Sequence, residues 1–158
     1  PLELLQQVRS EATSFFDLPL QTKQKTSAPF GLGYMGQGTE NVAATLKDGE
    51  ELPQDQKESL NLTLPVRDPV WPSDMPTLTK ASQAYYKQVE DLAGHLMRLF
   101  ALALHLDESF FDDKVDNAFT CLRLLNYPKQ DNVSEDKHKH KLADEHAIRN
   151  AEHTDYGT

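Results

Sequence analysis

The spacing of apolar residues at the start of the chain predicts a helix. These residues recur every three or four positions, which places their side chains on one face of a helix. The stripe consists of Leu4, Leu5, Val8, Ala12, Phe15 and Phe16. We expect the helix to end at the Asp17–Leu–Pro19 segment, because Pro19 disfavours helical backbone at the residue before it. Residues 21–25 then predict a short polar turn.

A second and longer helix is predicted between Leu78 and Leu106. Thr77 is the expected N-cap, since its hydroxyl could accept a bond from a free backbone N–H of the first turn. The apolar stripe consists of Leu78, Tyr85, Val89, Leu92, Leu96, Leu99 and Ala103. From Leu96 onward the pattern becomes apolar nearly all round, which indicates burial against a large partner layer. Core packing explains this stripe better than a cofactor site does.

Two segments have the pattern of β-strands. Residues 58–64 alternate apolar and polar side chains, and residues 119–128 are rich in apolar residues and end at Pro128. A proline-rich connector follows the first strand, and its Trp71, the sole tryptophan, is expected to be a packing anchor. The sequence therefore predicts a mixture of helices and strands.

The remaining segments are predicted to be turns and loops. Residues 28–38 hold four of the seven glycines and are expected to form a loop with an ordered Tyr34. A phosphate cradle is disfavoured there, because no Lys-Ser/Thr pair follows the glycines. An acidic stretch at 48–57 should be exposed, residues 108–113 should form a short helix or turn, and residues 129–150 should form a solvated loop.

Composition narrows the classes of function. A net charge of −9 argues against a main role in binding nucleic acid, which needs a basic surface. No apolar run is long enough to span a membrane, and the start lacks the layout of a signal peptide. With one cysteine, Cys121, no internal disulfide is possible, and we expect a cytoplasmic location. Cys121 itself is expected to be a small core residue rather than a nucleophile.

The last residues contain a candidate metal motif, His153-Thr-Asp155. On a strand, residues two apart point to the same face, so both side chains could reach one metal ion. Chance alone gives such a pattern easily, and His105-Leu-Asp107 repeats it at a predicted helix end, where chelation is unfavourable. The histidines within 129–150 fit a solvated loop better than a metal site. Context must therefore support the motif.

Seven short motifs, taken in order, supply that context. They are Phe15-Phe-Asp-Leu-Pro19 with Lys23, Gly33-Tyr34, Lys57-Glu-Ser59, Trp71-Pro72, Tyr85-Tyr86 in the long helix, Leu122-Arg-Leu-Leu-Asn-Tyr-Pro128, and His153-Thr-Asp-Tyr-Gly157. In this order they resemble the isopenicillin N synthase-like family of non-haem iron(II), 2-oxoglutarate-dependent dioxygenases. The resemblance extends from about Leu5 to Thr158.

The resemblance implies a fold and a site. The fold would be α+β: a helical N-terminal region, with one or two strands, over 1–118, and the start of a double-stranded β-helix (jelly roll) over 119–158. His153 and Asp155 would be two of three iron ligands, and Tyr127 would contact the 2-oxoglutarate or the substrate carboxylate. Many relatives carry Asn two residues before this Tyr. Leu125 stands there instead, with Asn126 shifted by one, so no Asn contact is assigned.

The resemblance also implies a reaction. Iron(II), 2-oxoglutarate and dioxygen would oxidise a small organic molecule by hydroxylation, desaturation or ring closure, releasing succinate and carbon dioxide. No side chain is assigned as a catalytic acid or base. The second iron-binding His and the Arg-x-Ser motif that anchors 2-oxoglutarate would lie beyond residue 158, so we expect an incomplete chain.

Two alternatives remain open at this point. One is an iron-dependent oxidase of the same family that does not use 2-oxoglutarate. The other is a non-catalytic helical interaction module, in which the 78–106 stripe binds a partner and the His-x-Asp motif is accidental. For the enzyme we expect a monomer or weak oligomer, a small-molecule substrate, and neither a nucleic-acid nor a membrane partner.

Overall fold

The computed structural model describes residues 2–39, 57–64, 70–116 and 119–128. Helices and strands follow one another along the chain in the order α, α, 3₁₀, β, β, α, β. Their bounds are α1 Leu2–Phe16, α2 Leu20–Gln24, η1 Pro29–Gly31, β1 Gly33–Met35, β2 Glu58–Leu62, α3 Pro76–Ala103 and β3 Leu122–Asn126. The first helix, the long helix and both predicted strands are confirmed, with β2 and β3 shorter than the segments whose pattern indicated them.

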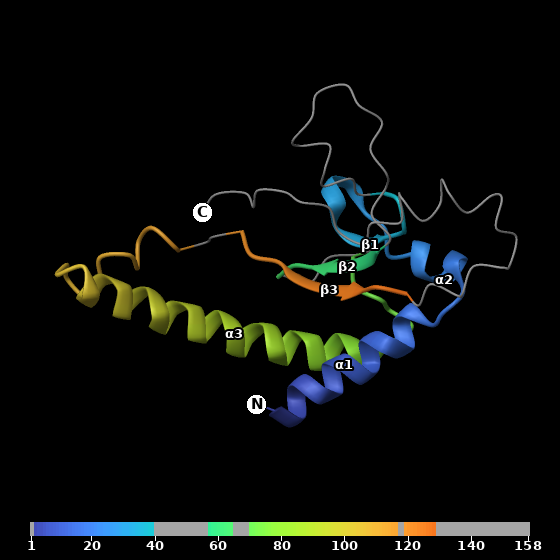
Figure 1. The fold of residues 1–158 in the computed structure, drawn as a ribbon, viewed down its shortest axis with the longest axis horizontal. Coiled ribbons are helices and arrows are strands. Elements are labelled where there is room, and N and C mark those ends of the chain that lie inside the picture. The colour runs from blue at the N-terminus through green and yellow to red at the C-terminus, as the bar shows by residue number, and fades with distance from the viewer. Residues whose placement is uncertain (1, 40–56, 65–69, 117–118, 129–158) are drawn as a thin grey trace, which may run out of the picture.

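The three strands form one antiparallel sheet in the order β1-β2-β3 (Figure 1). In the central strand β2, Leu60 is paired with Tyr34 of β1 and with Leu124 of β3. Pairing with β3 runs from Leu62 opposite Leu122 to Glu58 opposite Asn126. Side chains two apart share a face, so this register decides which residues meet on each side of the sheet.

Helices α1 and α3 lie against one face of the sheet and enclose the hydrophobic core (Figure 1). Leu122 and Leu124 of β3 are partly buried against the core, so their side of β3 faces the helices. The buried core consists of Ala12, Phe15, Phe16, Tyr34, Leu60, Leu62, Val70, Trp71 and Leu78. Trp71 is buried and donates its indole N–H to the carbonyl of Thr63 at 3.0 Å, which confirms the packing anchor.

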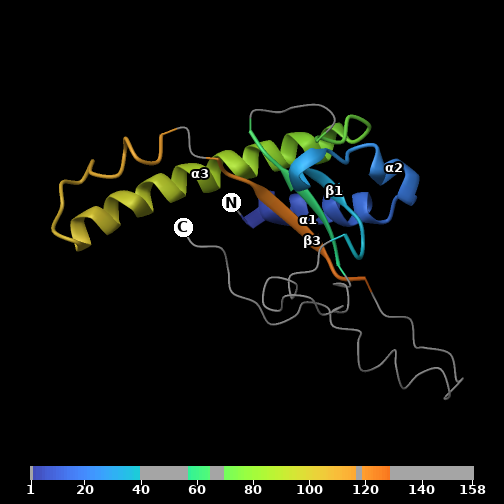
Figure 2. The same ribbon diagram turned by 90° about the horizontal axis from the view of Figure 1, so that it is seen from above.

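The second half of α3 extends past the sheet, as both views show (Figure 2). Its first half buries Leu78, Ala81, Ser82 and Tyr86, whereas five apolar side chains near its end are exposed. These five are Leu92, Leu96, Leu99, Phe100 and Leu102. The expected burial of this end against a partner layer is therefore not provided by the described residues. That a partner layer covers this end of α3 stays a prediction.

Helix α3 begins and ends differently from the predicted limits. Thr77 is not the N-cap: the helix starts at Pro76, Met75 holds the cap position, and no side-chain bond caps it. Proline suits the first helical position because its fixed φ is already helical and no N–H is lost there. At the other end His105 adopts a left-handed backbone, φ 59°, and Leu106 N–H bonds to Ala101 O. His105 thus terminates the helix, which agrees with the helix end predicted at His105-Leu-Asp107.

Two segments predicted as irregular contain regular structure. The polar turn over 21–25 is mostly the short helix α2, which starts after Pro19 and buries Lys23. The loop over 28–38 includes η1 and the edge strand β1, and Tyr34 is ordered and buried there. Gly33 has φ +68°, and a Cβ built on it would lie 1.7 Å from Thr26 O, so only glycine fits.

Burial corrects two further expectations. Lys57, at the end of the stretch predicted to be exposed, is buried. Cys121 is exposed rather than in the core, because it lies before β3 at the border of a small groove beside α3. Partial burial of its thiol raises its pKa, which disfavours the reactive thiolate. Residues 108–113 form turns, in line with the pattern.

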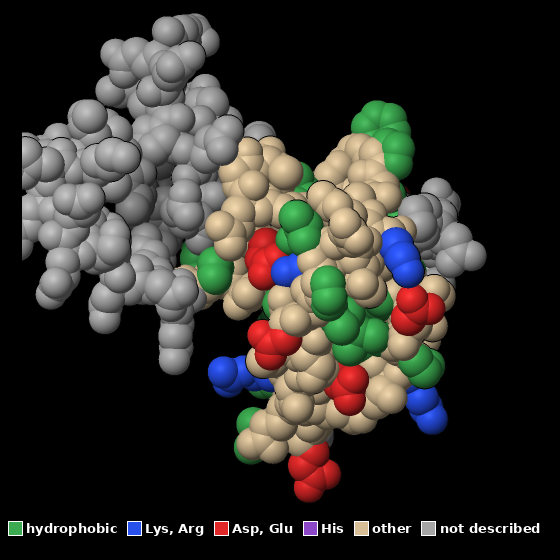
Figure 3. Space-filling view, turned by 90° about the vertical axis from the view of Figure 1, so that its right-hand side faces the viewer, with side chains coloured by type: hydrophobic (Ala, Val, Ile, Leu, Met, Phe, Trp, Pro, Cys, Tyr) green, Lys and Arg blue, Asp and Glu red, His purple; other side chains and the backbone are tan. Residues whose placement is uncertain are grey.

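The surface of the α2 side is mixed in character. Among the described residues on this face, acidic and basic side chains are scattered between hydrophobic and other atoms and do not gather into a single charged patch (Figure 3). No helix among the described residues is long and apolar enough to cross a membrane.

Candidate functional site

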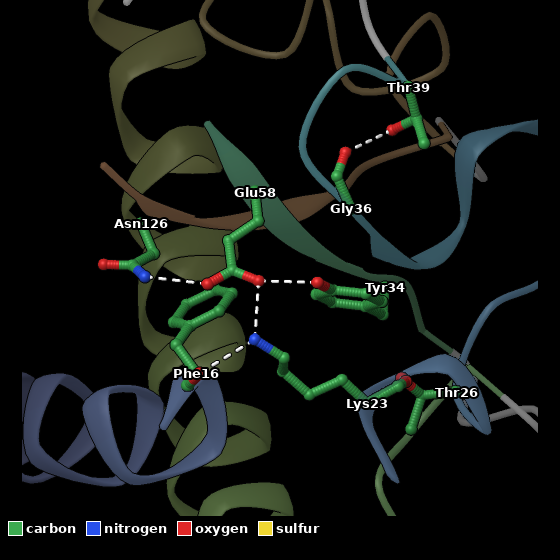
Figure 4. A network of polar contacts seen from close by, with 8 residues as sticks. All are labelled: Phe16, Lys23, Thr26, Tyr34, Gly36, Thr39, Glu58 and Asn126. Atoms are coloured by element: carbon green, nitrogen blue, oxygen red, sulfur yellow. Dashed lines mark hydrogen bonds and ion pairs between the residues drawn. The ribbon is translucent and has the colours of Figure 1, made fainter. Parts of the chain in front are cut away.

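A buried polar network joins five elements, the helices α1 and α2 and the three strands (Figure 4). Glu58 of β2 lies at its centre. Its Oε2 accepts hydrogen bonds from Lys23 Nζ at 2.7 Å and from Tyr34 O–H at 2.6 Å. Its Oε1 accepts one from Asn126 Nδ2 at 2.8 Å, and Lys23 Nζ also donates to Phe16 O at 2.8 Å. The Glu58 carboxylate thus has a donor on each of its oxygens.

Local structure explains why these side chains converge. Tyr34, Glu58 and Asn126 belong to three adjacent strands, and Glu58 is directly opposite Asn126. Helix α2 places Lys23 beside the same end of the sheet, with its Nζ 5.3 Å from the Tyr34 ring centroid. The last turn of α1 supplies the Phe16 carbonyl, which no longer has a partner within its own helix. The network therefore connects both N-terminal helices to all three strands.

The network keeps Glu58 ionised. The Lys23 and Glu58 side chains are only 9% and 6% exposed. Burial alone would raise the pKa of Glu58, but the bonds from Lys23, Tyr34 and Asn126 and the Lys23 charge lower it overall. Burial and the neighbouring carboxylate raise the pKa of Tyr34. Each of these two groups is thus held in one protonation state, which suits a structural role better than proton transfer.

A hollow of about 670 Å³ borders this network, between α2, the 3₁₀ turn and β1. Lys23, Tyr34 and Glu58 line part of it. Their hydrogen-bonding groups are already engaged with one another, so none of the three is available to bind a ligand without breaking the network. We therefore assign the network to positioning and stability rather than to chemistry.

The opposite face of β3 carries the one sequence-predicted site residue that the structure describes. Exposure alternates along 122–128: Arg123, Leu125 and Tyr127 are exposed, while Leu122, Leu124, Asn126 and Pro128 are partly buried. Because Leu122 and Leu124 face the helices, continuing this alternation one residue past the end of β3 puts Tyr127 on the other side of the sheet. Tyr127 is 38% exposed, and its phenol is chemically suited to donate to a carboxylate.

The predicted iron ligands, His153 and Asp155, lie outside the described residues, so their placement stays a prediction. Within the described part of the chain, no group of three or more His, Cys, Asp or Glu side chains could hold a metal ion. The candidate site is thus represented here by the β3 face that bears Tyr127 and by the network behind it.

The sequence patterns did not predict the network, although its residues lie in or beside the motifs already described. Lys23, Tyr34 and Glu58 each belong to one of the seven motifs, but their pairing was not predicted. Asn126 was noted only as a shifted residue without a role. The signal that could have revealed them was the presence of a lysine, a tyrosine and a glutamate in three separate motifs of the family pattern.

Comparison with known proteins shows which enzymes this chain is similar to. No family model matches the chain. The 2-oxoglutarate-Fe(II) type oxidoreductase hxnY of Emericella nidulans is 31% identical over 171 residues, covering 99% of this chain and 47% of that protein. Validamycin A dioxygenase of Streptomyces hygroscopicus subsp. limoneus is 26% identical, covering 100% of this chain and 45% of that protein.

Solved structures agree with these relatives. A full-length Neurospora crassa protein in complex with alpha-KG matches with a TM-score of 0.74 at 27% identity, over 99% of this chain and 48% of that one. JOX2 in complex with 2OG, Fe and JA matches with a TM-score of 0.65, also at 27% identity, over 81% of this chain and 38% of that one. The chain spans about half the length of the relatives it matches. In sequence and in fold, nearly the whole chain is similar to part of these 2-oxoglutarate-Fe(II) oxygenases.

Proposed function

We propose that this chain is part of an enzyme that oxidises a small organic molecule with iron(II), 2-oxoglutarate and dioxygen, and releases succinate and carbon dioxide. The observation that carries the proposal is a likeness to 2-oxoglutarate-Fe(II) oxygenases over nearly the whole chain, in sequence and in fold. Residues 119–158 would begin a jelly-roll core, and 1–118 the helical region that supports it. A cytoplasmic location remains part of the proposal.

His153 and Asp155 would hold the iron. A neutral imidazole and a carboxylate are ligands that suit iron(II), and a facial set of three protein ligands leaves positions open for 2-oxoglutarate and dioxygen. When bound, the metal supplies the redox chemistry. The role of His153 is to offer an unprotonated nitrogen, and the role of Asp155 is to add negative charge that favours a divalent cation.

Tyr127 would orient the carboxylate of the cosubstrate or of the substrate. Its place on the β3 face away from the helices supports this role, as does the chemistry of its hydroxyl, which donates one hydrogen bond. Leu125 lies on the same face, where an apolar side chain would help to exclude water from a pocket. Proton transfer is assigned to neither Tyr127 nor Leu125.

The test is succinate formation by the full-length protein supplied with iron(II), 2-oxoglutarate and dioxygen. We expect 2-oxoglutarate to be consumed and succinate to appear, and both to stop when iron is removed with a chelator. Tyr127→Phe removes the hydroxyl with little change in shape and should raise KM for 2-oxoglutarate. If the protein binds no iron and forms no succinate, the proposed enzymatic function is wrong.

The two alternatives predict different results in the same assay. An oxidase of this family would consume dioxygen in the presence of its substrate without consuming 2-oxoglutarate. A helical interaction module would show neither reaction, and its stability would be unaffected by iron(II). The dioxygenase is favoured because the matched structures include the Neurospora crassa protein with alpha-KG and JOX2 with 2OG and Fe.

A further inference from the structure

At the end of strand β3, a side-chain hydrogen bond from Asn126 to Glu58 holds the strand where the backbone pairing stops. Asn126 is the last residue of β3 and lies directly opposite Glu58, the first residue of β2. Asn126 Nδ2 donates to Glu58 Oε1 at 2.8 Å on the helix side of the sheet. Tyr127 is the next residue and lies just beyond the last pair of the ladder. Its backbone therefore takes its direction from the Asn126 position.

The Glu58 side chain that accepts this bond is itself held in place. Its other oxygen is held by Lys23 Nζ at 2.7 Å and by Tyr34 O–H at 2.6 Å. Both oxygens are thus occupied by donors from three different elements, and the charged acceptor strengthens each bond. A side chain whose rotamer is fixed in this way can hold a neighbour in place, as outer-shell partners do around functional groups.

We propose that Asn126, anchored by Glu58, is a positioning residue for Tyr127 and so for binding of the 2-oxo acid. This inference rests on the proposed function. Alternation along β3 puts the two neighbours on opposite faces: Asn126 faces the buried network, and Tyr127 faces away from the helices. A fixed Asn126 side chain would set the rotation of the strand end and thereby the direction of the phenol.

The experiment measures the dissociation constant of 2-oxoglutarate for full-length protein loaded with Mn(II), which binds without turnover. Asn126→Ala removes the donor to Glu58, and we expect binding to weaken about fivefold, the effect of roughly one net hydrogen bond. Asn126→Asp keeps the shape but turns an acceptor toward Glu58 Oε1, so it should weaken binding as well. With iron, KM for 2-oxoglutarate should rise while kcat at saturation changes less than about twofold.

Two controls separate positioning from general destabilisation. Leu122→Ala truncates the same face of β3 without touching Glu58, so it should lower the unfolding temperature and leave 2-oxoglutarate affinity unchanged. In the double variant Asn126→Ala/Tyr127→Phe, binding should be no weaker than in Tyr127→Phe alone, because Asn126 acts through the tyrosine hydroxyl.

Unchanged affinity in Asn126→Ala, or fully additive effects in the double variant, would overturn the positioning role and leave the proposed function intact. Loss of affinity in Leu122→Ala equal to that in Asn126→Ala would also overturn it. Wild-type protein that does not bind 2-oxoglutarate at all would overturn the proposed function, and the inference with it. These four results are distinguishable within one set of titrations.

Discussion

Replacing Glu58 with Gln should destabilise the protein strongly, although the two side chains have the same shape. Glu58 accepts three hydrogen bonds, from Lys23, Tyr34 and Asn126. A glutamine could keep its single oxygen toward Lys23 and Tyr34. Its amide nitrogen would then face Asn126, whose own amide can turn to accept. The substitution therefore creates no cavity, and what it removes is mainly the negative charge beside a buried ammonium.

The size of the effect follows from the geometry. Two unit charges 2.7 Å apart attract by about 6 kcal/mol at an effective dielectric constant of 20, and desolvation offsets part of this. Removing one partner leaves the Lys23 charge buried, with the Phe16 carbonyl and a neutral amide as acceptors. Breaking a buried pair in this way typically costs about 3–5 kcal/mol. We expect the free energy of unfolding to fall by that amount.

Urea unfolding of the full-length protein, followed by circular dichroism, gives the measurement. Lys87→Met is the matched control, because Lys87 forms an ion pair of the same length, 2.7 Å to Asp91, on the exposed surface of α3. That variant should barely shift the unfolding midpoint. The double variant Lys23→Met/Glu58→Gln should lose less than the sum of its single variants. A loss below about 1 kcal/mol in Glu58→Gln would refute the reasoning, since that is the range of solvated pairs.

Two further predictions concern pH and backbone strain. The pKa of Glu58 is lowered by folding, so its contribution to stability is complete above about pH 4.3 and is lost as pH falls through the lower folded value. The pKa of Tyr34 is raised, so its contribution is complete below about pH 10 and is lost as pH rises through the folded value. Unfolding free energies measured across pH should show both declines, and a Glu58→Gln variant that kept the acidic decline unchanged would contradict the assignment. Gly33→Ala should cost more than about 2 kcal/mol, because its Cβ would meet Thr26 O at positive φ, whereas Gly94→Ala, in open space on α3, should gain about 0.5–1 kcal/mol. Equal effects at the two glycines in thermal unfolding would show that Gly33 is not constrained as described.

The local spacing of apolar residues was sufficient to predict the longer helices and strands, but not the residues at which they begin and end. Three-to-four spacing identified α1 through Val8 and Phe15, because one helical face of apolar residues must be buried. The start of α3 was misplaced because Thr77 offered a plausible hydroxyl, while Pro76 fixed the backbone one residue earlier. Short elements such as β1 depend on pairing with a distant strand, and three residues carry too little pattern to show it.

The buried network shows why the site could be predicted only in part. Lys23 and Glu58 are 35 positions apart, and Glu58 and Asn126 are 68 apart. No periodicity relates such residues, so their contact depends on the register of the sheet and the position of α2. In the same way, periodicity correctly gave the apolar positions of α3, such as Leu96 and Leu99, but could not say what covers them.

His153 and Asp155 are proposed to bind iron(II) in a 2-oxoglutarate-dependent oxygenase, and this binding can be measured directly. The measurement is anaerobic iron(II) binding by the full-length protein, compared between wild type, His153→Ala and His105→Asn. The last variant changes the other His-x-Asp motif and keeps a residue that tolerates its left-handed backbone. We predict one bound iron per chain in wild type and in His105→Asn, and a large loss of affinity in His153→Ala. Equal iron binding by all three proteins would contradict the proposed ligands.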